Sequence, residues 1–218
     1  IANVSPIPIT VVSGGVTSNS VSFDVASVPT RASLSPTTVT AGGGQFTLTV
    51  NGTGFTPGTI TQWNGTTLAT TFVKATQLTA TVPASLLASA GTAQITAVTS
   101  GVSSNALSLV VSVAITSLNP AAGSSSGQPF TLTVTGSGFT SSSVVEWNGV
   151  PLETTFGSAT QLTAAVPGNL SQNPGSAQVS VLSNGVLSNP IAFALVYPLS
   201  AINLSGLTAT AVPTQPLS

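Results

Sequence analysis

The sequence predicts an all-β protein made of two consecutive β-sandwiches, with incomplete β elements at both ends. Three observations lead to this fold class. The chain contains a long internal repeat, apolar and hydroxyl side chains alternate with a period of two inside each repeat, and Gly and Pro separate the alternating runs. Only residues 84–88 and 168–174 leave room for a helical turn, so the chain is predicted to contain almost no helix.

The repeat is ungapped. Residues 28–111 and 112–195 share 36 identities in 84 aligned positions, and "FTLTVNGTGFT" at 46–56 returns as "FTLTVTGSGFT" at 130–140. A repeat of this length exceeds a solenoid unit and has the size of a small domain. The chain is therefore expected to divide into four parts, at 1–27, 28–112, 113–198 and 199–218.

The alternation predicts the strands. Phe46, Leu48 and Val50 alternate with Thr47 and Thr49, as in antiparallel strands that bury one face and place threonine on the other. Short strands with frequent turn signals predict two sandwiches of about seven strands each. The residues expected to be buried are Phe46, Leu48, Leu78, Val82 and Leu107, with their equivalents 84 positions later.

The only two tryptophans, Trp63 and Trp147, each precede an Asn-Gly pair. Asn-Gly favours a two-residue hairpin turn, because a type I′ turn requires positive φ at both central positions. The tryptophan would then anchor the strand end in or beside the core. The functional alternative is an exposed indole that stacks on a sugar ring.

Charge is almost absent from the chain. Charged residues make up 2% of the sequence and the net charge is −1, so the surface would attract neither nucleic acid nor an anionic membrane. No apolar run approaches the roughly 18 residues that a membrane span needs. We therefore expect a β protein covered with hydroxyl and amide groups, without nucleic-acid partners and without a membrane span.

The residue types needed for most catalytic sites are missing. Without His or Cys, zinc sites and histidine-based triads are excluded. Glu146 and Glu153 could imitate a glycosidase carboxylate pair, but solvated strand residues are the better interpretation, because repeat one has Gln62 and Ala69 there. We expect no catalytic residues, no metal site and no cofactor, and hence no enzyme.

Several segments together resemble a known family. "SLSP", "FTLTVNGTGF", "WNGT", "ATQLTATVP" and "GTAQITAV", repeated across 28–198, resemble the IPT/TIG domain, an immunoglobulin-like fold. The similarity is to tandem copies in large bacterial exported and surface proteins. The resemblance implies immunoglobulin-like sandwiches, a structural or binding role, an extracellular or cell-surface location, and no catalytic residues to carry over.

Both ends of the chain depart from the complete repeat. Residues 9–25 match 95–111 at a shift of 86 and would supply the last two strands of a further repeat. At the other end, "AINLSG" at 201–206 resembles "RASLSP" at 31–36. Either the sequence is a window on a longer chain of repeats, or the C-terminal strand of one copy completes the N-terminal element of the next.

The leading functional hypothesis follows from these ends and from the nearly uncharged surface, which favours association. It is a structural subunit of an extracellular filament or surface polymer, assembled head to tail by strand complementation, with copies of itself as partners. The residues expected at the assembly interface are Ile7, Ile9, Val11, Val21, Phe23, Val25, Ile202, Leu204, Leu207, Ala209 and Ala211.

The alternative hypothesis is an adhesin or a carbohydrate-associated spacer module of a larger surface protein. Its partners would be surface glycans, contacted by loops or by Trp63 and Trp147. Asn-x-Ser/Thr sequons also make the chain a candidate glycoprotein. The candidate glycan sites are Asn3, Asn51, Asn64, Asn169 and Asn203.

Overall fold

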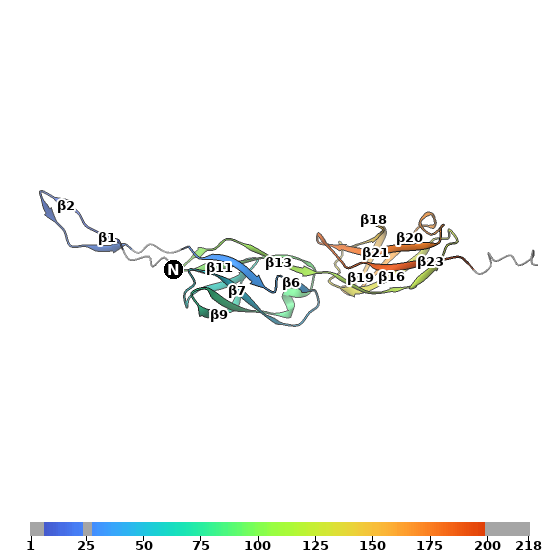
Figure 1. Cartoon of the computed structure of the whole chain (residues 1–218), viewed down its shortest axis with the longest axis horizontal. Helices are drawn as coiled ribbons and strands as arrows, with labels where there is room; N and C mark the ends of the chain where they lie inside the picture. Colours follow the sequence, from blue (N-terminus) through green and yellow to red (C-terminus); the bar gives the residue numbers. More distant parts are fainter. Residues whose placement is uncertain (1–6, 24–27, 199–218) are drawn as a thin grey trace, which may run out of the picture.

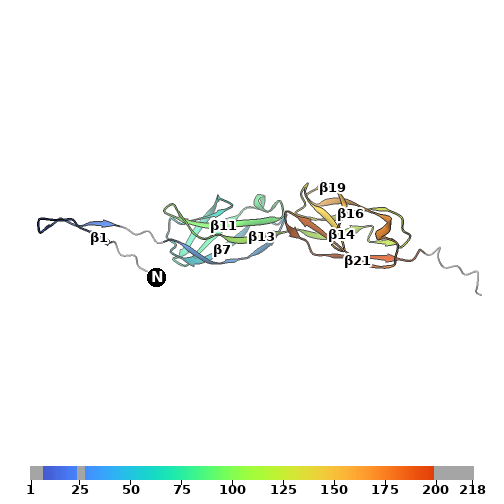
Figure 2. The same ribbon diagram turned by 90° about the horizontal axis from the view of Figure 1, so that it is seen from above.

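The computed structural model describes residues 7–23 and 28–198. Figure 1 shows a β-hairpin followed by two β-sandwiches that lie end to end along one axis. Figure 2, turned by 90°, shows the same succession. The hairpin consists of β1 (Ile7–Ile9), β2 (Val12–Ser13), β3 (Val16–Thr17) and β4 (Val21–Phe23).

The first sandwich, called domain 1 here, comprises nine strands and one 3₁₀ turn, η1 (Ala84–Leu87). Its hydrogen-bonded strand order is β5-β7-β10-β9-β8-β11-β13-β6. β9 is long enough to pair with β10 in one layer and with β8 in the other. The strands are β5 (Thr30–Ser35), β6 (Thr38–Thr40), β7 (Phe46–Thr53), β8 (Ile60–Trp63), β9 (Thr66–Lys74), β10 (Gln77–Val82), β11 (Gly91–Thr99), β12 (Val102–Ser103) and β13 (Leu107–Ser112).

The second sandwich, domain 2, repeats this order with one interruption. The strand equivalent to β9 is split into β18 and β19 around Leu152, so the two layers are separate sheets. Pro151 stands where domain 1 has Thr67, and the ladder continues past it because Leu152 N donates to Val145 O at 2.8 Å. The elements are β14 (Ala114–Asn119), β15 (Ala122–Ser124), β16 (Phe130–Ser137), β17 (Val144–Trp147), β18 (Val150–Pro151), β19 (Glu153–Ser158), β20 (Gln161–Val166), η2 (Gly168–Leu170), β21 (Gly175–Ser183), β22 (Val186–Leu187) and β23 (Ile191–Val196).

The predicted all-β, immunoglobulin-like fold is confirmed, and so is the alternation within it. On β7, Leu48 and Val50 are fully buried while Thr47 is exposed. The prediction of burial is wrong for Phe46 and Leu107, which are only partly buried. Each is the first residue of its strand, where the sandwich opens to solvent. The same holds for their equivalents, Phe130 and Ile191.

The Asn-Gly turns are as the sequence predicts. φ is +47° at Asn64 and +83° at Gly65, and it is +50° at Asn148 and +78° at Gly149. Both central residues of each turn therefore have positive φ, as a type I′ hairpin requires. The turns connect β8 to β9 and β17 to β18.

A single residue, Val113, separates the last strand of domain 1 from the first strand of domain 2. Val113 is 2% exposed and packs with the core of domain 2, as does Ala90 of domain 1. Two hydrogen bonds cross the boundary, from Ala90 N to Gly138 O at 3.3 Å and from Asn184 Nδ2 to Ala90 O at 2.9 Å. The two domains therefore form an extended rod. It is held by the short linker, the buried side chains and the two hydrogen bonds across the boundary.

Candidate assembly site

The N-terminal hairpin has the strand register of the last hairpin of domain 1. β1 pairs with β4 so that Ile9 faces Val21, and β11 pairs with β13 so that Ile95 faces Leu107. These positions correspond at the shift of 86 found in the sequence. The hairpin is thus built like a β11–β13 unit.

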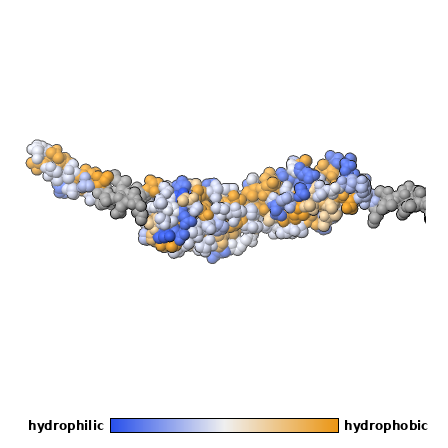
Figure 3. All heavy atoms as spheres, viewed as in Figure 1, coloured by the Kyte–Doolittle hydropathy of each residue, from blue (hydrophilic) through white to orange (hydrophobic). Residues whose placement is uncertain are grey.

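The two hairpins differ in what covers them. Ile9 and Val11 are 52% and 67% exposed, whereas their equivalents Ile95 and Ala97 are 0% exposed. In domain 1 the side chains of β7 and β10, in the facing layer, cover that face and belong to the same core. Figure 3 shows apolar residues over the hairpin at the end of the chain. The face that forms the core in a complete domain is therefore open in the hairpin.

Four of the residues predicted at the assembly interface lie in this hairpin and are exposed. Ile7, Ile9, Val11 and Val21 are 53%, 52%, 67% and 66% exposed. The side chain of Phe23 and the remaining predicted positions lie outside the described residues. Those remaining positions are Val25, Ile202, Leu204, Leu207, Ala209 and Ala211.

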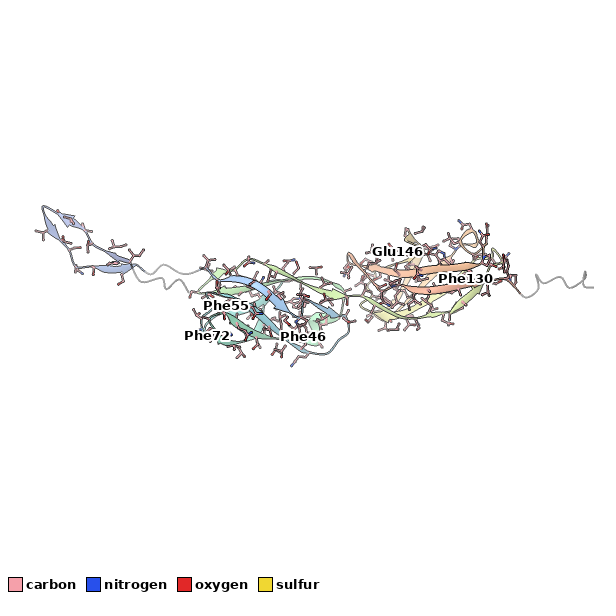
Figure 4. All side chains as sticks on the ribbon, viewed as in Figure 1. Phe46, Phe55, Phe72, Phe130 and Glu146 are labelled. Carbon is pink, nitrogen blue, oxygen red and sulfur yellow. The ribbon has the colours of Figure 1, made fainter. Side chains whose placement is uncertain are left out.

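Both tryptophans belong to the cores. Trp63 is 5% exposed and Trp147 is 2% exposed, so neither indole offers a face to a sugar. In domain 2 the ring of Trp147 lies 6.3 Å from that of Phe130 and 5.2 Å from that of Phe193, centroid to centroid; Figure 4 labels Phe130. The structure corrects the stacking alternative, because the residue before each Asn-Gly turn points inward.

The two glutamates of the described residues form no recognisable site. Glu146 is half-buried, and its Oε2 accepts from Ser180 Oγ at 3.4 Å, while Glu153 is exposed. Within residues 7–23 and 28–198 there is no group of three His, Cys, Asp or Glu residues that could hold a metal ion. In the same segments no helix has the length and apolar character needed to cross a membrane.

Arg31 is the one charged residue buried in a domain, at 5% exposure. Its Nε and Nη2 donate to Asn105 O at 3.0 and 2.8 Å, and its Nη1 has no hydrogen-bond partner among the described residues. Burial lowers the pKa of the Arg31 guanidinium to about 10, because the charged form loses hydration.

Two of the described sequon asparagines use their side chains internally. Asn51 bonds Ser33 and Gln77 at 3.2 and 3.0 Å, and Asn64 Oδ1 accepts from Gln94 N at 2.7 Å. Asn169 is exposed in η2. Asn64 is exposed as well, whereas Asn51 is only partly exposed, and Asn3 and Asn203 lie outside the described residues.

A shallow groove occurs at the same place in both domains. In domain 2 it has a volume of about 470 Å³ and includes Phe130, Pro151 and Pro167 in its lining. In domain 1 it has a volume of about 340 Å³ and includes Leu68 and Pro83. The second copy is larger and richer in proline, and neither was indicated by the sequence pattern.

The architecture defines a class of protein, the tandem immunoglobulin-like β-sandwich proteins. The chain belongs to the IPT/TIG domain family, because the IPT/TIG domain model matches residues 29–111 and 114–195. No curated protein sequence matches the chain.

Solved structures share parts of the fold at low identity. A structure with a xylogluco-oligosaccharide is 17% identical over 77% of this chain and 41% of its own, with a TM-score of 0.45. The plexin A4 extracellular region is 17% identical over 78% of this chain and 16% of its own, with a TM-score of 0.36. The Yersinia pseudotuberculosis adhesin InvE is 16% identical over 74% of this chain and 57% of its own, with a TM-score of 0.36. The chain thus spans less than two thirds of each of these structures.

Proposed function

We propose that the chain is a structural subunit of an extracellular filament or surface polymer, in which a strand of one copy completes the N-terminal hairpin of the next. The observation that carries this proposal is the open face of the hairpin. Ile9 and Val11 are more than half exposed, although the same register in domain 1 buries their equivalents completely.

The open face is energetically unfavourable by itself. A two-stranded hairpin is marginally stable in water, and burial of each valine or isoleucine would contribute about 1.5–3 kcal/mol. Several such side chains lie on this short hairpin, so a partner strand would gain both apolar burial and ladder hydrogen bonds. A partner supplied by the far end of another copy gives a head-to-tail contact that does not close, and hence a filament.

The remaining properties of the chain support a structural role. The surface is nearly uncharged, which favours association, and the domains abut through the single residue Val113. In this proposal the chain has no catalytic activity and no cofactor, its partners are copies of itself, and it acts at the cell surface or outside the cell.

The test compares the full chain with a variant that lacks residues 199–218. Among the described residues, the buried cores of the two domains extend from Leu34 to Leu195, so we expect the variant to fold. Electron microscopy and sedimentation should show polymers for the full chain and single rods for the variant. Polymers of the same axial repeat from the variant would show that the segment is not the donor.

A second candidate function is a spacer in a larger surface protein, and the domain boundary favours it. The one-residue linker and the bonds between Ala90, Gly138 and Asn184 would hold binding regions at a fixed distance. In that case small-angle scattering should report a monodisperse rod at every concentration, and the full chain should not polymerise.

A further inference from the structure

An asparagine in each complete domain holds the first strand of the sandwich. Asn105 Oδ1 accepts from Arg31 N at 2.8 Å, and its Nδ2 donates to Arg31 O at 3.2 Å. Asn189 makes the same pair of bonds to Ile115, both at 3.0 Å. The amide thereby pairs both backbone groups of one residue, as a neighbouring strand would. We call this arrangement the asparagine clasp.

The serine before each asparagine positions the clasp. Ser104 Oγ accepts from Ala97 N at 3.0 Å and donates to Asn105 O at 2.8 Å. Ser188 does the same with Val181 N and Asn189 O, at 2.9 and 2.8 Å. These bonds fix the bend at which the hairpin strand reaches the asparagine, and so they fix where the amide lies.

The N-terminal hairpin contains the same Ser-Asn arrangement. Ser18 Oγ accepts from Val11 N at 3.0 Å and donates to Asn19 O at 2.9 Å, and Ser18 N donates to Val11 O at 2.9 Å. The Asn19 amide itself makes no hydrogen bond to any residue within 7–23 or 28–198. The hairpin thus contains the serine that positions a clasp asparagine. The strand that this asparagine would hold is not among the described residues.

We infer that Asn19 is a receptor for the backbone of an incoming strand, and that this strand is residues 201–211 of a second copy. The inference rests on the proposed function and specifies its contact. Residues 201–211 repeat the clasped segment of domain 1, 31–41, at five positions. The shared residues are Leu34, Ser35, Thr38, Thr40 and Ala41, which return as Leu204, Ser205, Thr208, Thr210 and Ala211.

The alignment sets the register and direction of the incoming strand. Ala201 takes the place of Arg31, so Asn19 Oδ1 accepts from Ala201 N and Asn19 Nδ2 donates to Ala201 O. In both domains the segment after the clasp then pairs in parallel with the last strand, β6 with β13 and β15 with β23. Residues 208–210 of the incoming chain would therefore run in the same direction as β4.

The test uses the chain without residues 199–218, a synthetic peptide of residues 199–212, and a peptide of scrambled order. Nuclear magnetic resonance of ¹⁵N-labelled asparagine side chains reports each amide. Asn105 and Asn189 supply the reference, since both are already clasped. The peptide should shift the Asn19 amide and slow its hydrogen exchange toward the two references, and the scrambled peptide should not.

Substitutions distinguish the contribution of the Asn19 side chain to peptide binding from that of the other contacts of the added strand. Asn19→Ala should weaken peptide binding about tenfold or more, because two hydrogen bonds are lost. A peptide with Ala201→Pro, which has no N–H at that position, should also bind more weakly. Asn189→Ala is the matched control: it removes the clasp inside domain 2 and should lower the stability of that domain without changing the peptide affinity.

The outcomes separate the two proposals. If the peptide binds equally well to Asn19→Ala, the clasp is refuted while strand complementation stands. If the peptide does not bind and the shortened chain still forms the same polymers, the clasp and the proposed donor segment are both refuted.

Discussion

At two buried positions, domain 1 has a polar residue where domain 2 has an apolar one. Thr61 and its equivalent Val145 are both 0% exposed, and each backbone N–H bonds a threonine hydroxyl, at 2.9 and 3.0 Å. Val145 leaves no polar atom behind, whereas Thr61 Oγ1 has no hydrogen-bond partner among the described residues. Arg31 and Ile115 repeat the contrast, since Arg31 Nη1 is also unpartnered in that part of the chain.

An aromatic cluster further stabilises the core of domain 2 relative to that of domain 1. Phe193, where domain 1 has Leu109, lies 5.5 Å from Phe130 and 5.2 Å from Trp147, centroid to centroid. Aromatic pairs contribute about 0.5–1.5 kcal/mol beyond their buried area. The same framework thus accommodates orphaned polar atoms in one copy and an aromatic cluster in the other, and we expect domain 1 to unfold first.

The largest expected effect tests whether the shared framework is equally important in both domains. Leu48→Ala and Leu132→Ala each remove a fully buried side chain at an equivalent position, and each should lower the free energy of unfolding of its domain by about 2–5 kcal/mol. Hydrogen exchange read by mass spectrometry on peptides from each domain measures the two effects separately. If only one of the two substitutions lowered the free energy of unfolding of its domain, the two positions would not be equivalent.

The next effect concerns the boundary between the domains. Gly138 has φ +80°, and an added Cβ would lie 2.5 Å from Ala41 Cβ of domain 1. Gly138→Ala should cost about 1–3 kcal/mol through backbone strain and change the angle of the rod in small-angle scattering. Gly149→Ala is the control, because its φ is +78° with no atom within 4 Å: it should cost stability and leave the rod shape unchanged.

Exchanging Thr61 and Val145 tests the polar contrast itself. Val145→Thr should cost domain 2 about 1–3 kcal/mol, because it buries a hydroxyl without a partner. Thr61→Val should stabilise domain 1 by about 1 kcal/mol. Denaturant unfolding monitored by the same domain-resolved exchange gives both values. If Thr61→Val destabilises domain 1, its hydroxyl has a partner in solution, for example a bound water.

The smallest expected effect is a dependence on alkaline pH. Since burial lowers the pKa of Arg31 to about 10, the unfolded chain binds this proton more tightly between pH 10 and the ordinary pKa of the side chain. The free energy of unfolding of domain 1 should therefore rise with pH in that window. Arg31→Ile, which introduces the residue of domain 2, should remove the rise. An identical pH profile in Arg31→Ile would show that other groups cause it.

Much of this architecture was predictable because the repeat and the period-two alternation are strong local signals. The Asn-Gly turns and the buried Leu48 and Val82 followed from them. The partial exposure of Phe46 did not, because alternation assigns a face of a strand and not a position along it. For a related reason, the sequence does not decide whether Trp63 points inward. An aromatic residue beside a turn is compatible with burial in the core and with exposure to solvent.

The clasp was missed although its signal is in the sequence. A Ser-Asn pair recurs at 18–19, 104–105 and 188–189, but in a chain so rich in Ser and Asn its meaning appears only with the bonds to Arg31 and Ile115. The orphaned Thr61 hydroxyl could not be predicted either, since it depends on which neighbours surround one buried atom.

The parallel pairing of β6 with β13, and of β15 with β23, has a mechanical consequence. The chain enters each domain through β5 or β14, which leads directly into the first strand of such a pair, and it leaves at the end of the second strand. Tension between the chain ends therefore pulls the two strands past each other along their length. Their hydrogen bonds then share the load instead of opening one after another. Each domain should resist stretching along the rod more strongly than pulling across its strands, which single-molecule force measurements with two attachment geometries would reveal.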